Sequence, residues 1–397
     1  MTPAAGSAPG ESESPALSPI PVLYMNHVVE VSGAEGSLLA LLASLDRTQF
    51  RPLAALPATE GPLADRLAQL GVPLHEAPLQ RLRRTANPFT NLGQVAGLRR
   101  ARAVIGRICR AEKVALVHAN SFHAALACAI RGGALPPIIW HVRDVQMPPP
   151  VVRWLAGRVA RMVAISGAVA AYLAKLVPDS ARKVVLVHNG IEAETTTPAR
   201  PSVEVRAELG VPEEAALVVC VGQLVPWKRQ NLFIEAAHIV ARFYPEAHFA
   251  IIGADLFDEH PEYVRQLKQA ASAGPAQVHF CGYRPDATDI IAAADVLAHP
   301  ATAEPLGRVI LEAMALGTPV VAANAGGPAE LLVDTESGLL VEPLSAQALA
   351  DGILWLLENP QFADDIARQA RERVVANFSA ASMARKIEAV YCEVLRG

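Results

Sequence analysis

Short apolar runs alternate with longer amphipathic stretches along most of the chain. An apolar run of about four to eight residues between turn residues is typical of a strand that is buried on both faces. Strands that alternate with helices form parallel sheets from βαβ units. The sequence therefore predicts an α/β protein with strands at 21–26, 51–56, 114–119, 137–142, 161–166, 183–188, 217–222, 248–253, 277–282, 295–300 and 318–323.

The alternation breaks once, at residues 192–201, where the chain is polar and rich in Thr and Pro. Such a composition is typical of a linker, so we expect two α/β domains, at 19–194 and 195–378. Residues 1–18 have neither a basic start nor an apolar stretch, and we interpret them as a disordered tail. Because ligands bind beyond the carboxyl ends of parallel strands, the expected binding site is a cleft between the two domains.

Composition narrows the possible functions. The chain has 397 residues and a net charge of −4, so its overall charge does not favour a nucleic-acid partner. Its five scattered cysteines form no Cys-x-x-Cys pair, and no apolar stretch is long enough to span a bilayer, so we expect a cytoplasmic protein. The sequence lacks a P-loop, a GxGxxG fingerprint and an Asp-x-Asp pair. We therefore expect neither a bound cofactor nor a metal ion.

The stretch EPLGRVILEAMALG, residues 304–317, carries the strongest chemical signal. Pro305 suits the first turn of a helix and Gly317 suits the left-handed cap at its end, so we expect a helix from about 306 to 316. The first N–H groups of a helix are unpaired and lie at the positive end of its dipole, which suits a phosphate. Here these groups would belong to Leu306, Gly307 and Arg308.

Two glutamates accompany this helix, Glu304 just before it and Glu312 within it. An ionised carboxylate only accepts hydrogen bonds, so each glutamate suits the hydroxyl groups of a ligand. A nucleotide sugar has hydroxyls on both sides of a diphosphate. The pattern predicts the sugar at Glu304, the phosphates at the helix start and the ribose at Glu312. The alternative is a solvated helix that carries two ordinary surface glutamates.

The spacing of these glutamates resembles the Glu-x7-Glu motif of the family 4 glycosyltransferases. The resemblance implies the GT-B fold, in which two Rossmann-like domains flank a deep cleft and the C-terminal helix, here 379–397, crosses back to the first domain. It also implies a glycosyltransferase, most simply a hexosyltransferase, that uses a UDP-sugar or GDP-sugar, retains the anomeric configuration and needs no metal. Other stretches that resemble the family lie at 32–45, 188–192, 221–237, 278–283 and 317–343.

The resemblance implies roles for individual residues. Lys228 matches the family lysine that neutralises the donor diphosphate, and His141 matches by position the histidine that reaches the donor sugar. The alternatives are a surface lysine and a structural histidine, and we interpret His118 as structural. Ser32 and Gly33 match a loop opposite the diphosphate. Tyr283 and Arg284 match the segment that holds the nucleobase, largely through backbone groups.

The sequence departs from the family pattern at Gln223, where the family usually has an arginine that shares the diphosphate with the lysine. A bidentate guanidinium from Arg308 is expected to supply the missing charge, with Arg229 as the rival. We expect the leaving diphosphate to help deprotonate the incoming hydroxyl on the same face; a double displacement through a carboxylate is the alternative. The expected catalytic residues are Glu304, His141 and Lys228.

The acceptor, a hydroxyl of a glycan, a lipid-linked sugar or a small molecule, is expected in the N-terminal domain. There, segment 81–113 is strongly basic, with Glu112 as its one acid. Its spacing predicts an amphipathic helix with a basic face, which suits peripheral contact with an anionic membrane; the alternative is a solvated face of a packed helix. The basic residues are Arg81, Arg83, Arg84, Arg99, Arg100, Arg102, Arg107, Arg110 and Lys113. Competing functions are a nucleotide-sugar epimerase and a non-catalytic nucleotide-sugar binder.

Overall fold

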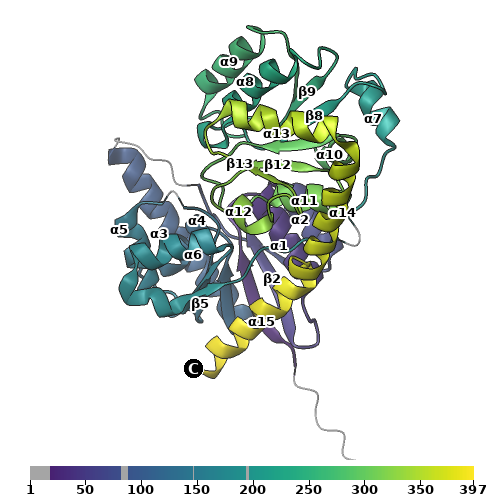
Figure 1. Ribbon diagram of the computed structural model, residues 1–397. Helices are drawn as coiled ribbons and strands as arrows, with labels where there is room; N and C mark the ends of the chain where they lie inside the picture. The colour runs from purple at the N-terminus through teal and green to yellow at the C-terminus, as the bar shows by residue number, and fades with distance from the viewer. Residues whose placement is uncertain (1–17, 82–87, 146, 194–195) are drawn as a thin grey trace, which may run out of the picture.

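A computed structural model describes residues 18–81, 88–145, 147–193 and 196–397, which form two α/β halves (Figure 1). The N-terminal half contains a parallel sheet with strand order β3-β2-β1-β4-β5-β6-β7. Its strands are β1 (Ile20–Met25), β2 (Phe50–Leu56), β3 (Leu74–Glu76), β4 (Leu116–Ala119), β5 (Ile138–Val142), β6 (Arg161–Ala164) and β7 (Val184–Leu186). Its helices are α1 (Gly33–Ala43), α2 (Pro62–Gln69), α3 (Pro88–Ala111), α4 (Phe122–Ala129), α5 (Pro149–Ala156), α6 (Gly167–Leu176) and the 3₁₀ turn η1 (Pro178–Lys183).

The C-terminal half contains a second parallel sheet, with strand order β10-β9-β8-β11-β12-β13. Its strands are β8 (Leu217–Val221), β9 (His248–Ile252), β10 (Gln277–Gly282), β11 (Val296–His299), β12 (Val320–Ala323) and β13 (Leu339–Val341). The helices and the 3₁₀ turn of this half are α7 (Ser202–Glu208), η2 (Pro226–Lys228), α8 (Gln230–Val240), α9 (Pro261–Ala271), α10 (Ala287–Ala292), α11 (Arg308–Leu316), α12 (Pro328–Leu331) and α13 (Ala346–Glu358).

Each sheet is buried on both faces, as the continuous apolar runs predict. Along β1, Val22 and Tyr24 belong to one apolar cluster, whereas Leu23 and Met25 belong to the cluster on the opposite face. This division follows from the period of two along a strand, which sends successive side chains to opposite faces. A fully apolar run therefore needs helices on both sides of the sheet.

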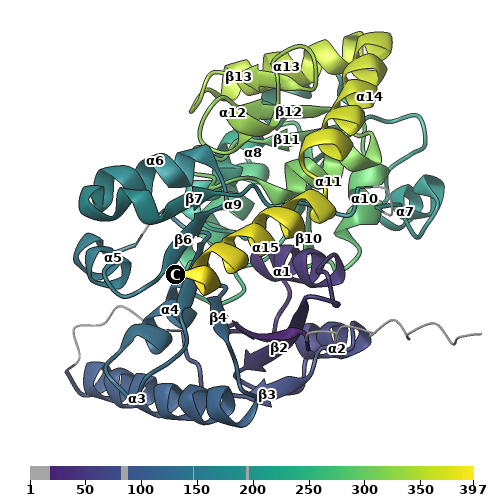
Figure 2. The ribbon, with the colours of Figure 1, turned by 90° about the horizontal axis from the view of Figure 1, so that it is seen from below.

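Two long helices connect the halves at the C-terminal end of the chain, α14 (Pro360–Asn377) and α15 (Ala380–Arg396). α14 packs against α11, and α15 lies along the N-terminal sheet (Figures 1 and 2). The apolar face of α15 joins the cluster that contains Tyr24 and Phe50, through Met383, Ile387 and Tyr391. The chain end thus completes the core of the half from which the chain started.

Every predicted strand is present, with bounds that differ by at most two residues at either end. Two strands of three residues, β3 and β13, were missed because each is too short to show a buried run, and β3 is also polar. The helices predicted after residue 345 are present and break at Asn359, as expected. Residues 1–17 and 194–195, which include the predicted tail and domain boundary, lie outside the described residues. No described helix has the length and apolar character needed to cross a bilayer.

The predicted start of the phosphate-facing helix is wrong by two residues. α11 begins at Arg308, so Pro305 and Leu306 lie in the loop before it. Gly307, with φ of 98°, is the residue before the first helical turn, a left-handed conformation that favours glycine. The predicted end is correct, because α11 ends at Leu316 and Gly317 follows as its left-handed cap.

Candidate active site

The loops that follow the strands of both sheets meet at one junction. The Arg308 side chain lies so close to α1 that a Cβ atom on Gly36 would be 3.0 Å from its Nε atom. The Tyr283 hydroxyl donates to the Val31 carbonyl oxygen at 3.4 Å. Parallel strands place their carboxyl ends at the same edge, so these contacts bring the ligand-binding edges of both sheets together.

A buried ion pair forms the centre of the junction on the C-terminal side. Lys228 donates to the carboxylate of Glu304, and His299 Nε2 lies 3.3 Å from the same carboxylate oxygen. Burial alone would raise the pKa of Glu304, but the Lys228 ammonium and the neighbouring His299 hold it well below its usual range. Glu304 is therefore an ionised acceptor at all ordinary pH values.

The loop that carries Glu304 is held by a pair of glycines. The N–H of Gly327 donates to the carbonyl oxygen of Glu304 at 2.9 Å. A Cβ atom on Gly327 would lie 2.1 Å from the Cα of Leu306, so no larger residue fits without a shift of the backbone. A Cβ atom on Gly326 would lie 2.6 Å from the Glu304 carbonyl oxygen, which is also too close for a larger residue. The Gly-Gly turn thus fixes the carboxylate and the start of α11 with respect to each other.

Arg308 and Glu312 are brought together at the start of α11. Arg308 Nε donates to Glu312 Oε1 at 2.8 Å, and its guanidinium also approaches the Ser37 hydroxyl of α1 at 3.5 Å. A Cβ atom on Gly33 of α1 would be 3.9 Å from the aliphatic stem of Arg308. The guanidinium therefore lies between the N-terminal ends of α1 and α11, where an anion would be favoured by both helix dipoles.

Ser32 and Gly33 form the start of α1. The resemblance implies that their loop lies opposite the diphosphate. Ser32 is the residue before the first turn, and its N–H and hydroxyl both donate to Glu35, at 3.2 and 2.5 Å. Asn26 also donates to Glu35, at 3.1 Å. These bonds hold the loop after β1 in place, and Glu35 is fully enclosed by them.

His141 lies on the N-terminal side and is fully buried. Its Nδ1 atom is 3.3 Å from an N–H group of Arg143 and 3.1 Å from His118 Nε2. An arginine only donates, so Nδ1 must accept and the proton of the neutral ring must lie on Nε2. Burial, then the charge of Arg143 and the neighbouring His118 ring, lower the pKa of His141 well below its usual value. The ring is a neutral donor through Nε2, which has no hydrogen-bond partner among the described residues.

The hydrogen bonds continue from His118 to the C-terminal helix. The Tyr391 hydroxyl lies 2.7 Å from His118 Nδ1, and the hydroxyls of Tyr391 and Tyr24 are 3.0 Å apart. Because His118 donates to His141 through Nε2, its Nδ1 atom accepts from Tyr391. Burial and the Arg143 charge lower the pKa of His118 to about 3, so it stays neutral. His118 is thus buried and hydrogen-bonded within the protein, which agrees with the structural interpretation, and it also contacts His141 directly.

The remaining predicted donor-binding residues take different positions. Tyr283 is half exposed at the junction. Arg284 is engaged away from it, in ion pairs with Asp286 and Glu208 at 2.6 Å each. Gln223 lies in the loop between β8 and Lys228, where its carbonyl oxygen accepts from the side chain of Gln230 at 2.8 Å. The Arg284 side chain therefore serves the packing of this half, as backbone recognition of a base would allow.

Arg229, the rival of Arg308, adopts a left-handed conformation with φ of 60° directly after Lys228. Its Nε atom is buried without a hydrogen-bond partner among the described residues. Sequence analysis missed His299, although the signal was present: it ends β11 and precedes Glu304 by five residues. Among the described residues, no group of three His, Cys, Asp or Glu side chains is arranged to hold a metal ion.

The basic segment forms the predicted helix, α3, whose apolar face is buried through residues such as Ala101 and Ile105. One basic residue does not lie on the solvated face. Arg102 is 7% exposed and donates to the carbonyl oxygen of Gly133. The side chains of residues 82–92, including Arg83 and Arg84, lie outside the described part of the segment.

Comparison with known proteins identifies the family. Residues 31–195 match the family described as Glycosyltransferase Family 4, and residues 202–373 match the family described as Glycosyl transferases group 1. The chain belongs to the family 4 glycosyltransferases. The two matches correspond to the two sheet-containing halves, which confirms both the resemblance and the enzyme class.

Relatives in this family act on different molecules. The chain is 29% identical to alpha-maltose-1-phosphate synthase of Mycolicibacterium smegmatis over 78% of this chain and 87% of the relative. It is 33% identical to D-inositol 3-phosphate glycosyltransferase of Nocardioides over 48% of this chain and 44% of the relative. The chain thus spans most of the first relative but less than half of the second. Their names indicate a shared reaction class and no single acceptor.

Solved structures confirm the GT-B fold class. Anabaena Alr3699/HepE in complex with UDP-glucose superposes with a TM-score of 0.80 and 27% identity, over 94% of this chain and 100% of that chain. Sucrose-phosphate synthase of Thermosynechococcus elongatus superposes with a TM-score of 0.74 and 19% identity, over 95% and 99% of the two chains. The second likeness supports the fold alone. Both agree with two parallel sheets that face each other at their carboxyl ends.

Proposed function

We propose that this glycosyltransferase moves a sugar from a nucleotide diphosphate to a hydroxyl acceptor, with retention at the anomeric carbon and without a metal ion. The observation that carries the proposal is the Glu304–Lys228 pair beside the start of α11. It places an ionised acceptor for sugar hydroxyls next to an ammonium group and the unpaired N–H groups of a helix, which suit a diphosphate. The bound UDP-glucose of the Anabaena neighbour supports a UDP-sugar as the donor to test first.

In the proposed reaction the bond between the anomeric carbon and the diphosphate oxygen breaks. The acceptor oxygen forms the new bond on the same face, and its proton passes to the departing phosphate oxygen. Lys228, Arg308 and the N–H groups of α11 stabilise the charge that develops on the diphosphate. His141, held neutral, donates through Nε2 to a sugar hydroxyl, and Glu304 accepts from others. The protein thus contributes position and charge stabilisation.

We propose that the acceptor binds to the N-terminal half, and that the basic segment 81–113 provides a peripheral contact with anionic membrane surfaces. The names of two relatives, an alpha-maltose-1-phosphate synthase and a D-inositol 3-phosphate glycosyltransferase, support a hydroxyl-bearing acceptor without selecting one. The membrane contact rests on the absence of Asp and Glu from α3. Salt should weaken it, because the Debye length is about 10 Å at 0.1 M ionic strength.

A panel of UDP-, GDP- and ADP-sugars tests the proposal, each with and without EDTA. Transfer or slow hydrolysis of one donor, unaffected by EDTA and with an unchanged anomeric configuration by NMR, is the expected result. A changed sugar on an intact nucleotide would indicate an epimerase, and binding without turnover would indicate a non-catalytic binder. Loss of activity in EDTA that Mg²⁺ or Mn²⁺ restores would overturn metal independence, and an inverted product would overturn retention.

A further inference from the structure

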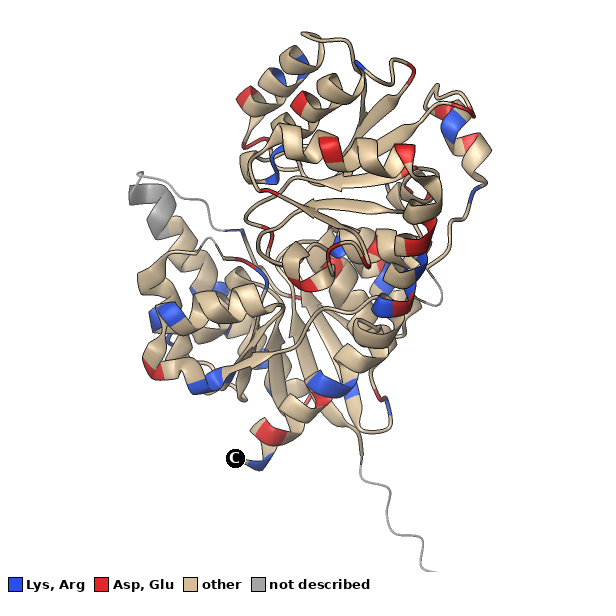
Figure 3. Ribbon diagram, in the orientation of Figure 1, with Lys and Arg blue, Asp and Glu red and all other residues tan. Residues whose placement is uncertain are grey.

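A second group of unused positive charges lies far from the junction. In two perpendicular views α3 lies at the outer edge of the N-terminal half, away from α11 (Figures 1 and 2). The sequence of α3 contains five arginines and neither Asp nor Glu, and the lobe that contains it shows mainly basic positions in Figure 3. The proposed transfer reaction needs none of these residues, and a membrane contact would use only the exposed ones, so the buried Arg102 requires another explanation.

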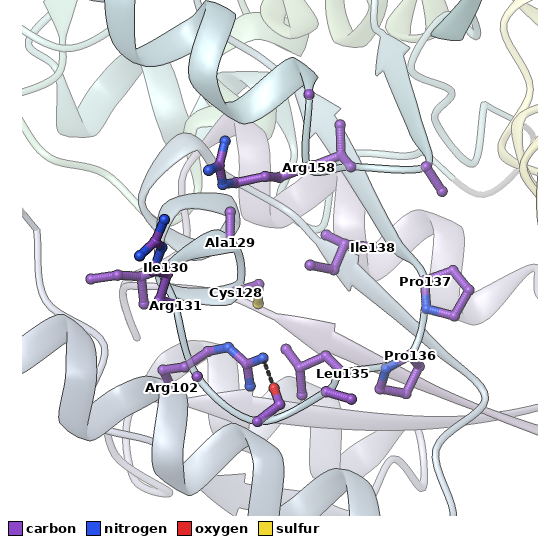
Figure 4. Close-up of a pocket in the computed structure, with 16 residues that line it drawn as sticks. Arg102, Cys128, Ala129, Ile130, Arg131, Leu135, Pro136, Pro137, Ile138 and Arg158 are labelled. Carbon is purple, nitrogen blue, oxygen red and sulfur yellow. Dashed lines mark hydrogen bonds between the residues drawn. The ribbon is translucent and has the colours of Figure 1, made fainter.

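Two adjoining hollows lie between α3 and the loop that follows α4. One has a volume of about 570 Å³ and the other about 530 Å³, and both are lined by Arg102, Arg131, Gly132 and Gly133. Arg102, Arg131 and Arg158 enter from three separate segments, as Figure 4 shows. The larger hollow is also lined by Arg99, Arg107 and Arg110. We call these two hollows the arginine pocket; among the described residues that line it there is no Asp or Glu.

Two guanidinium groups converge inside the arginine pocket over a single glycine. A Cβ atom on Gly106 would lie 3.6 Å from an N–H nitrogen of Arg110 and 3.7 Å from one of Arg102. The missing side chain of Gly106 therefore leaves a small cradle between two positive groups. Like charges this close repel each other in a partly buried site, unless an anion lies between them.

Arg102 is built into the protein and is not a freely moving surface side chain. It is 7% exposed, and it donates to the carbonyl oxygen of Gly133. A Cβ atom on Gly132 would lie 3.0 Å from its Cγ atom, so the glycine-rich loop encloses its stem. Its Nε atom is buried and has no hydrogen-bond partner among the described residues, which leaves a donor unused. Burial lowers the pKa of Arg102, as expected of a cation without a counter-ion.

We propose that the arginine pocket binds a phosphate-bearing anion, separate from the nucleotide sugar. Guanidinium groups bind phosphate oxygens in a bidentate way at about 2.7–2.9 Å, and the cradle over Gly106 presents two of them to one group. The ligand is either a soluble phosphorylated compound or the phosphate of a lipid head group. In both cases the same arginines hold it.

Three single substitutions that each change the net charge by the same amount test the proposal. Arg110→Gln removes one side of the cradle, and Gly106→Asp places a carboxylate inside it. Arg100→Gln is the matched control, because Arg100 is an exposed residue of the same helix that does not line the pocket. Circular dichroism melts verify that each variant is folded.

Titration calorimetry with inorganic pyrophosphate measures whether the pocket binds a soluble phosphate compound. Excess UDP is present so that a diphosphate site at Lys228 is filled. We expect Arg110→Gln and Gly106→Asp to weaken pyrophosphate binding about tenfold or more, since a lost charged hydrogen bond is worth at least one decade of affinity. Arg100→Gln should bind like the wild type. The comparison among variants stays valid even if UDP does not bind, because they differ only near α3.

Sedimentation with vesicles measures whether the pocket binds a lipid phosphate. Binding to phosphatidylglycerol vesicles is compared with binding to phosphatidylcholine vesicles. Loss of vesicle binding in the same two variants identifies a lipid phosphate as the source. Loss of pyrophosphate binding with unchanged vesicle behaviour identifies a soluble compound. The proposal is overturned if the wild type binds neither probe, if all variants bind alike, or if Arg100→Gln loses as much pyrophosphate affinity as Arg110→Gln.

Discussion

The two sides of the junction use opposite electrostatics. On the C-terminal side, Glu304 and Lys228 are both ionised and paired, with His299 against them. On the N-terminal side, His118 and His141 are buried and neutral in a continuous set of hydrogen bonds that reaches Tyr391. Both groups are almost free of solvent. Burial alone therefore does not decide whether a group is charged; the partners do.

This difference indicates which role each side of the junction has in the proposed reaction. An ion pair can exchange partners, so Lys228 can turn from Glu304 towards a phosphate while Glu304 turns to a hydroxyl. The hydrogen-bonded, uncharged side chains on the N-terminal side cannot supply a charge, but they can fix which nitrogen of His141 carries the proton. The C-terminal side thus suits the leaving diphosphate, and the N-terminal side suits the uncharged sugar.

The largest effect is expected from breaking the charged side. Glu304→Gln and Lys228→Met should each lower transfer by about 10- to 100-fold, since a charged hydrogen-bond partner is worth about 1.5–3 kcal/mol and about 1.4 kcal/mol is tenfold. Steady-state kinetics with the preferred donor measure the loss. Glu358→Gln, an exposed residue at the end of α13, is the control and should have no effect. Wild-type rates in Glu304→Gln would remove this carboxylate from the proposed site.

A tenfold effect is expected at Arg308, which could supply the charge that Gln223 lacks. Arg308→Ala should lower turnover about tenfold, which is about 1.4 kcal/mol of transition-state stabilisation. Adding Gln223→Arg to this variant should restore part of the loss. The same kinetics on Arg229→Ala, which should be near normal, separate the two arginines.

The Arg308–Glu312 contact allows a second explanation, in which Arg308 only orients Glu312. A double-mutant cycle with Glu312→Ala separates the two, since residues that act through one contact are not additive. If Arg308→Ala has no further effect in the Glu312→Ala background, its role is to position Glu312. Nearly additive losses would support a direct contact with the phosphates.

The sequence was sufficient for the parts of this molecule that depend on local pattern. Strands were predictable because each buried run is apolar throughout, and the Glu304 loop because its chemistry lies within a few residues. The hydrogen bonds from His141 through His118 to Tyr391 were not predictable. Tyr391 lies 273 residues from His118 and meets it only because α15 returns to the first sheet. Arg102 resembled any other basic residue of α3 until the glycine-rich loop was placed against it. Distant contacts of this kind carry no sequence signal without related sequences.

A smaller effect is expected from removing the hydrogen bond between Tyr391 and His118 on the N-terminal side. Tyr391→Phe removes one hydroxyl and keeps the packing, so His118 loses the donor to its Nδ1 atom. We expect turnover to fall a few-fold, with little change in the affinity for the nucleotide. Nitrogen-15 NMR of the histidine rings should show that His118 samples both neutral tautomers, while Arg143 keeps the proton of His141 on Nε2. A variant with unchanged tautomers and lower turnover would show that the hydroxyl acts otherwise.

The smallest effect concerns stability and pH. The pKa of His118 is about 3 in the folded protein, because of burial and then Arg143, whereas the usual value is about 6.5. Above pH 6.5 both states are neutral, so His118 adds no pH dependence. Below it the unfolded chain takes up a proton that the folded protein does not, and stability falls by up to about 1.4 kcal/mol per pH unit. His118→Gln should remove this contribution.

Urea unfolding of the wild type and His118→Gln from pH 8 to pH 5 measures the change. At pH 8 the difference between the two proteins reports only the lost hydrogen bonds. Towards pH 5 the free energies of unfolding should converge, because only the wild type pays the added cost of a histidine held neutral. Parallel curves would mean that the folded protein protonates His118, which would then donate through both ring nitrogens and could not accept from Tyr391.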